Sequence, residues 1–335
     1  MTVDLSTTWL GLELPHPVMP GASPLVDDLD TVKRLEDAGA ACIVMHSLFE
    51  EQLQAEQMAA YKLLDGPGES YAEATSYFPT TSDFNLGPDA YLEQIRKIRE
   101  AVELPVIGSL NGSTPGGWLE YAKLIEDAGA SALELNMYRL PSDPAVGARG
   151  VEEHQLEMVR AVKRGVTIPV AVKLSPFYTS LPHFVSRLQE AGVAGVVVFN
   201  RFYQADIDPD SLSLNRTLQL SDRTELLLRL RWLAILSART PIPLGCSGGV
   251  FKPIDVVKAL MAGASAVQTV SALLEIGPKH LTFLREGLSR WLEEHEYESV
   301  TQLIGSMNLA RCPDPSEYER SNYIKLLQSY HGAAD

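Results

Sequence analysis

The chain has 335 residues, of which 45% are hydrophobic and 21% charged, the balance of a soluble globular protein with a sizeable core. Its formal net charge of −15 argues against nucleic acid or an anionic membrane as a partner, because both would repel it at long range. Three scattered cysteines exclude a disulfide framework and a four-thiolate iron–sulfur cluster, and we expect no metal site.

Short β-branched runs alternate with segments of helical periodicity, a pattern typical of βα units and a parallel sheet. In chain order the predicted strands are Pro17–Ala22, Ala41–Ser47, Pro105–Leu110, Ala132–Asn136, Pro169–Leu174, Gly195–Asn200, Ile242–Cys246 and Ser265–Thr269. The helical patterns are Asp28–Ala38, Asp89–Ala101, Gly117–Ala128, Glu152–Arg164, Pro182–Ala191, Arg223–Ala238 and Pro253–Met261. Four of these helices end in Ala-Gly just before the next strand, which predicts a left-handed glycine that closes each helix.

Eight such units in about 280 residues predict a (β/α)8 TIM barrel made by residues 1–335 as one domain. A doubly wound open sheet is the alternative, but its G-x-G-x-x-G turn is absent. The long insertion after the second strand, Glu50–Asn85, is expected to form a lid or wall. From about Glu298 onward we expect two short helices packed outside the barrel, with a break at Cys312–Pro315. Cys42 and Cys246 lie in apolar runs and are expected to be buried core residues.

Polar residues follow the predicted strands at the end that faces the active site of a barrel. They are Ser23, His46, Ser47, Asn111, Asn136, Lys173, Asn200, Ser247, Gly248, Gly249, Thr269, Val270 and Ser271. Lys173 ends a strand that should be buried, where a lysine without a partner costs several kcal/mol. It either fixes a bound anion or electron-rich ring, or it reaches solvent or pairs with Glu134 on the neighbouring strand.

Two turns after the last strands, Ser247–Val250 and Thr269–Ala272, stand where barrels bind phosphate. As a pair they predict a phosphorylated ligand. Asn136 and Asn200 end strands, where their amides either contact the polar edge of a planar ring or cap the following segment.

A set of motifs in register resembles the dihydroorotate dehydrogenases, the cytosolic class 1 branch in particular, over nearly the whole chain. The matching pieces are HPVMPGAS, AGAACIVMHS, NLGPDAYL, ELN, PVAVKLSP, VVVFN and GCSGGV…AGASAVQTVSAL. The resemblance implies FMN, with its phosphate at Gly248, Gly249, Val270 and Ser271 beside Thr269, and with Lys173 next to the flavin ring. It implies that Ala22, Ser47, Asn111, Asn136 and Asn200, beside Ser23, line the ring and the ribityl chain. The implied reaction is hydride transfer from a small cyclic substrate such as dihydroorotate to flavin N5, a step of pyrimidine biosynthesis, while a base removes a proton.

The chain departs from the family on the substrate side. His46 replaces a flavin-contacting lysine, Arg139 stands at the place of the catalytic cysteine, and Pro141 replaces an asparagine. The asparagine-rich substrate loop is also replaced, by Phe78–Asp83. Tyr138, Ser142 and His46 are therefore the candidate bases, and Arg139 suits a carboxylate-bearing substrate alongside Asn136 and Asn200.

The alternatives are a family member that acts on a different small compound, a degenerate flavin-binding barrel, and a phosphate-binding lyase. In the lyase, Lys173 would form a Schiff base with Glu134 as its acid/base partner. We expect a cytoplasmic protein, since the N-terminus lacks a signal peptide and no apolar stretch reaches roughly 18 residues. The family suggests a homodimer, and the electron acceptor is unidentified.

Overall fold

The structure, a computed structural model, describes residues 3–49, 88–112, 115–137, 140–201, 204–215, 218–320 and 322–329. Eight parallel strands in this part of the chain run in the order β3–β13–β12–β9–β8–β7–β6–β4. Their bounds are β3 Val18–Pro20, β4 Ile43–Val44, β6 Val106–Asn111, β7 Ala132–Asn136, β8 Val170–Leu174, β9 Gly195–Val198, β12 Leu244–Ser247 and β13 Ala266–Thr269. Short β5 (Leu48–Phe49) pairs with β6 beyond the end of β4.

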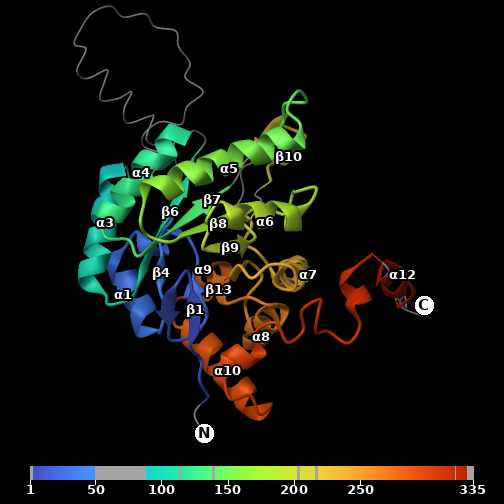
Figure 1. Cartoon of the computed structure of the whole chain (residues 1–335). Coiled ribbons are helices and arrows are strands. Elements are labelled where there is room, and N and C mark those ends of the chain that lie inside the picture. The colour runs from blue at the N-terminus through green and yellow to red at the C-terminus, as the bar shows by residue number, and fades with distance from the viewer. Residues whose placement is uncertain are drawn as a thin grey trace, which may run out of the picture.

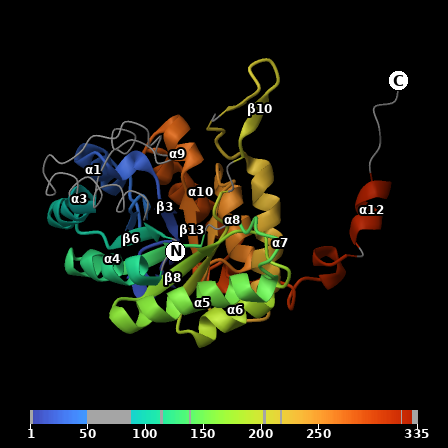
Figure 2. The same ribbon diagram turned by 90° about the horizontal axis from the view of Figure 1, so that it is seen from above.

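The two outer strands of this order approach each other and nearly close the sheet. The Ala41 N–H, just before β4, donates to the Val18 carbonyl of β3 at 3.2 Å. Helices surround the strands, as the view from above shows (Figure 2). They are α1 Leu29–Asp37, α3 Pro88–Ala101, α4 Pro115–Asp127, α5 Ala148–Gly165, α6 Leu181–Glu190, α7 Leu226–Ser237, α8 Pro253–Ala262 and α10 His280–Glu294. The predicted TIM barrel is confirmed, and each predicted helix and strand matches an observed one to within a few residues (Figure 1).

The four helix-ending glycines also follow the prediction. Gly39, Gly129, Gly192 and Gly263 have φ angles of +79°, +97°, +85° and +117°. A side chain at such an angle is strained, so glycine ends each helix and lets the next strand begin at once.

An N-terminal hairpin, β1 (Thr7–Trp9) and β2 (Leu12–Leu14), contributes the side chain that fills the barrel interior from below. Trp9 is 1% exposed and packs with the inward residues of the strands. A Cβ at Gly195 or Gly245 would lie 2.9 or 3.1 Å from the Trp9 ring, so glycine there makes room for the indole. Cys42 and Cys246 are buried as predicted, and burial raises the pKa of the Cys246 thiol to about 12.

The C-terminal segment differs from the expectation in one respect. α11 (Val300–Leu303) packs against α8. α12 (Asn322–Gln328) packs instead against the 3-10 turn Pro315–Tyr318. Figure 1 shows α12 well apart from the barrel, and its apolar residues Ile324 and Leu327 are more than 60% exposed. The prediction that both tail helices pack on the barrel is therefore wrong for α12. The insertion Glu50–Asn85 lies outside the described residues.

His16 makes the stability of this fold depend on pH. Its side chain is buried, its Nδ1 accepts a hydrogen bond from the Val18 N–H, and burial, aided by the Arg285 charge, lowers its pKa to about 4. Because the unfolded chain binds a proton near pH 6.5 and the folded chain does not, acid favours unfolding. We expect the free energy of unfolding to fall by about 3 kcal/mol in total between pH 6.5 and 4 from this group.

Urea titrations at a series of pH values measure this slope. His16→Gln should flatten it, while His183→Gln, at an exposed position on α6, should leave it unchanged. Equal slopes in the wild type and His16→Gln would contradict the assignment.

Candidate active site

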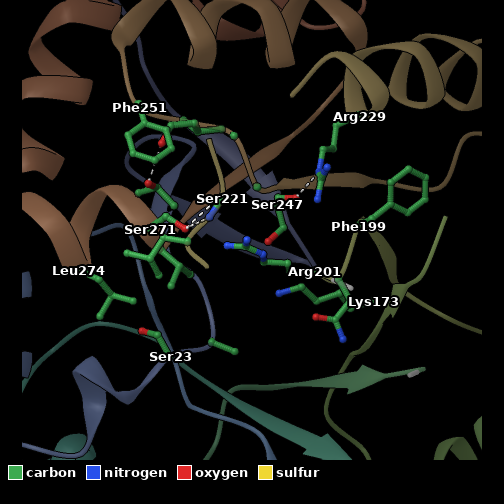
Figure 3. A pocket seen from close by; sticks show the side chains of 18 of the residues that line it. Ser23, Lys173, Phe199, Arg201, Ser221, Arg229, Ser247, Phe251, Ser271 and Leu274 are labelled. Atoms are coloured by element: carbon green, nitrogen blue, oxygen red, sulfur yellow. Dashed lines mark hydrogen bonds between the residues drawn. The ribbon is translucent and has the colours of Figure 1, made fainter. Parts of the chain in front are cut away.

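A cavity of about 460 Å³ opens at the C-terminal ends of β3, β8, β9, β12 and β13 (Figure 3). This volume suits a cofactor-sized ligand. The predicted residues on its wall are Ala22, Ser23, Lys173, Asn200, Ser247, Gly248, Gly249, Thr269, Val270 and Ser271. The barrel thus brings together residues up to about 250 positions apart in the sequence, because parallel strands all end at the same rim.

Lys173 sits in a buried cluster with Glu134 of β7 and Gln268 of β13. Its Nζ lies 3.3 Å from Glu134 Oε1 and donates to Gln268 Oε1 at 2.9 Å. The Gln268 Nε2 donates to Glu134 Oε2 at 2.6 Å, which turns the amide oxygen toward the lysine. The predicted pairing with Glu134 is confirmed, and Lys173 also lines the cavity; its contact with a bound anion or ring stays a prediction.

The arrangement leaves the ammonium group one hydrogen for a ligand. An ammonium has three donors, and Glu134 and Gln268 use two of them. Lys173 and Glu134 are 5% and 1% exposed, so each charge depends on the other for compensation. The cluster holds the Lys173 ammonium in a fixed position at the cavity, and its charge is compensated by Glu134.

Two turns lie at the end of the barrel where an anion cradle is predicted. Gly248 and Gly249 have φ angles of +103° and +79°, and a Cβ at Gly249 would lie 2.5 Å from the Leu226 backbone nitrogen. Thr269 Oγ1 donates to the Val250 carbonyl at 3.0 Å and joins the turn after β12 to the end of β13. Only glycine fits this backbone, which suits a turn whose N–H groups face an anion.

A second polar group joins Ser47, Ser109 and Asn136. Asn136 Nδ2 donates to Ser47 Oγ at 2.7 Å and to Ser109 Oγ at 2.8 Å. Asn136 is 2% exposed, and in the described part of the chain neither it, Ser47 nor Asn111 is on the cavity wall. The structure therefore brings Ser47 and Asn136 together, beside the cavity rather than on its wall.

Two of the candidate bases, His46 and Ser142, are described by the structure, and neither is on the cavity wall. His46 Nδ1 lies 2.7 Å from Asp27 Oδ1, and its ring meets Tyr91 edge-on with centroids 5.0 Å apart. Ser142 is exposed in the loop after β7. Tyr138 and Arg139 lie outside the described residues.

Sequence reasoning missed several wall residues, notably Arg201, Ser221, Arg229 and Phe251. Arg229 of α7 is 4% exposed, and its Nε donates to the Ser247 carbonyl at 2.8 Å, which braces the glycine turn from behind. Burial lowers the pKa of this guanidinium. The signal is present in LLLRLRW, where two arginines interrupt an apolar helical run and Arg229 is the buried one. Ser221 donates through its N–H to Ser271 Oγ at 3.0 Å, a contact between residues 50 apart.

The described wall fits an anionic ligand. The buried Ser23 Oγ has no hydrogen-bond partner among the described residues, and such a group is costly to leave unpaired. The side chains that carry charge on the described wall are Lys173, Arg201 and Arg229, all cationic. In the same part of the chain no cluster of three His, Cys, Asp or Glu residues suits a metal, and no helix is long and apolar enough to cross a membrane.

Comparison with known proteins identifies related sequences. A family model described as dihydroorotate dehydrogenase matches residues 84–292. A protein named putative dihydroorotate dehydrogenase A (fumarate) from Aeropyrum pernix is 28% identical over 311 residues, 90% of this chain and 97% of the relative. The catalytic subunit of dihydroorotate dehydrogenase B (NAD(+)) from Pyrococcus abyssi is 34% identical over 231 residues, 66% of this chain and 74% of the relative. The corresponding subunit from Endomicrobium trichonymphae is 26% identical over 93% of this chain and 99% of its own length.

Proposed function

Because the chain belongs to the dihydroorotate dehydrogenase family, we propose that it is an FMN-dependent oxidoreductase acting on a CH–CH bond of a small substrate. The family supports an oxidoreductase over the Schiff-base lyase. Lys173 also argues against the lyase, since its nitrogen is already hydrogen-bonded to Glu134 and Gln268.

The single observation that carries the cofactor assignment is the cavity of about 460 Å³ and its wall. In this proposal the turns at Gly248–Gly249 and Val270–Ser271 hold the phosphate, and the unpartnered Ser23 hydroxyl finds its hydrogen bond on the ligand. FMN held by these residues would supply the acceptor for a hydride from the substrate. The third hydrogen of the Lys173 ammonium is then free to stabilise negative charge on the ring.

We further propose that dihydroorotate is the first substrate to test, with a different small cyclic or unsaturated compound as the second. The loop after β7 departs from the family, since Arg139 and Pro141 occupy the positions of its cysteine and asparagine. Asn136, Asn200 and Arg139 are the proposed substrate contacts. Tyr138, Ser142 and His46 remain the proposed bases, and the contact between His46 Nδ1 and Asp27 leaves the other ring nitrogen of His46 for proton transfer.

Purified protein should be yellow, and heat should release one FMN per chain, measured by absorbance and chromatography. Anaerobic addition of dihydroorotate should bleach the flavin if pyrimidine biosynthesis is the retained role. A yellow protein that dihydroorotate leaves oxidised would redirect the search to other small substrates. A colourless protein that FMN cannot reconstitute would refute the function.

The electron acceptor and assembly are proposals from the family. The relatives are named for fumarate and for NAD(+), so reoxidation of the reduced protein by each compound should be compared. A homodimer is expected, and sedimentation of the purified chain measures it.

A further inference from the structure

The charge on the cavity wall is opposite to that of the whole protein. The chain has 43 acidic and 28 basic residues, yet the described wall carries Lys173, Arg201 and Arg229 and no carboxylate. Glu134 compensates Lys173. The role proposed for Lys173 leaves the two arginines on the wall, Arg201 and Arg229, without an assigned function.

Arg201 and Arg229 share one carboxylate, that of Glu225. Arg229 Nη2 lies 3.1 Å from Glu225 Oε2, whereas Arg201 Nε lies 3.9 Å from Glu225 Oε1. Arg229 also donates from Nη1 to the Glu225 carbonyl and from Nε to the Ser247 carbonyl. These two hydrogen bonds fix its guanidinium against the backbone of the turn. The carboxylates that interact with these arginines, those of Glu225 and Asp222, are not on the described wall, so the wall itself presents cations.

The Arg201 guanidinium reaches into the cavity. Arg201 follows Asn200 at the end of β9, and its side chain is 21% exposed. In Figure 3 its guanidinium lies in the cavity between Lys173 and the Ser221–Ser271 pair. The group therefore faces the space between the proposed ring site and the phosphate turns.

We propose that Arg201 binds an anionic oxygen group of the ligand in this cavity and makes binding selective for the charged form of that ligand. The inference rests on the proposed function. It adds a charged donor to the proposed site, where the phosphate turns supply only uncharged backbone N–H groups. A guanidinium matches phosphate and carboxylate oxygens with paired donors, so two sources fit: the phosphate of the flavin nucleotide and a carboxylate of the substrate.

Flavin-free full-length chain provides the test, with FMN, riboflavin and orotate as probes. Fluorescence titration gives the dissociation constants of FMN and of riboflavin, which lacks the phosphate. Orotate is titrated into the FMN-loaded chain by the change in flavin absorbance. Arg201→Gln is compared with Arg231→Gln, which removes the same charge at an exposed position of α7, and with Arg201→Lys, which retains it.

If Arg201 binds the phosphate, Arg201→Gln weakens FMN binding by about 10- to 100-fold and leaves riboflavin binding unchanged. If it binds the substrate carboxylate, FMN binding is unchanged and orotate binding weakens by a similar factor. Arg201→Lys should recover part of either loss, and Arg231→Gln should show none.

Unchanged affinity for all three probes in Arg201→Gln overturns the inference while the proposed function stands. Equal weakening of FMN and riboflavin also overturns it, because a charge contact distinguishes them; thermal melting of the variant then identifies general damage. Wild-type chain that binds neither flavin refutes the proposed function itself, and the inference with it.

Discussion

Replacement of Lys173 by methionine is expected to slow flavin reduction by substrate by roughly 10²- to 10³-fold, the cost of removing one preorganised donor. The ammonium is buried, oriented by Glu134 and Gln268, and has one hydrogen left for the cavity. Methionine keeps much of the side-chain volume but supplies neither the charge nor the donor. Anaerobic stopped-flow reduction, with whichever substrate bleaches the flavin, measures the rate.

The same replacement should also destabilise the fold, and a second variant separates the two effects. Without Lys173 the Glu134 carboxylate, 1% exposed, loses its counter-charge, at a cost of roughly 3–5 kcal/mol. Combining Lys173→Met with Glu134→Gln removes the unpaired charge and should recover most of that stability. The double variant should still reduce its flavin slowly. Recovery of the rate together with stability would show that Lys173 acts only on the fold.

Trp9→Ala is expected to lower the free energy of unfolding by roughly 3–5 kcal/mol, the range for removal of a buried large aromatic side chain. The indole is 1% exposed and fills space that Gly195 and Gly245 leave open inside the barrel. Because those positions have no side chain, the walls cannot fill the cavity that the substitution creates. Urea unfolding followed by far-UV circular dichroism measures the change.

Phe177→Ala provides the matched control, since that aromatic residue is 65% exposed and should change stability by less than about 1 kcal/mol. A loss at Trp9 no larger than that of the control would mean that the hairpin does not support the barrel. If the loss is large, Trp9→Phe should recover part of it.

Lys173 shows how far reasoning from the sequence reaches. A lysine at the end of the strand PVAVKL required a functional partner or an ion pair, and both alternatives were open. The structure pairs it with Glu134 on β7, which the sequence named, and with Gln268 on β13, which it did not. Gln268 lies 95 residues away, and its orientation follows from a hydrogen bond to Glu134 that no local pattern encodes.

Arg201 and Arg229, by contrast, are site residues that reasoning from the sequence missed. Arg201 and Arg229 lie on different segments and reach the same carboxylate, that of Glu225, only because β9 and α7 are adjacent in the barrel. Asn136 and Ser47, which the resemblance places along the ring, both contact Ser109 beside the cavity, a contact that no local pattern indicates. The position of a residue at a strand end predicts that it lies at the rim of the barrel. Its side-chain contacts depend on the residues of the two adjacent strands.

By itself the sequence determined the barrel, the four helix-ending glycines and the position of the glycine turn after β12, because each depends on residues close together in the chain. Local periodicity and backbone constraints act over a few residues, and glycine at a left-handed position is visible wherever it occurs. The tertiary structure alone decided the compensation of Lys173, the shared Glu225 between two arginines, and the separation of α12 from the barrel. Charge compensation and packing depend on distances between residues far apart in sequence, and only the closed arrangement of strands sets those distances.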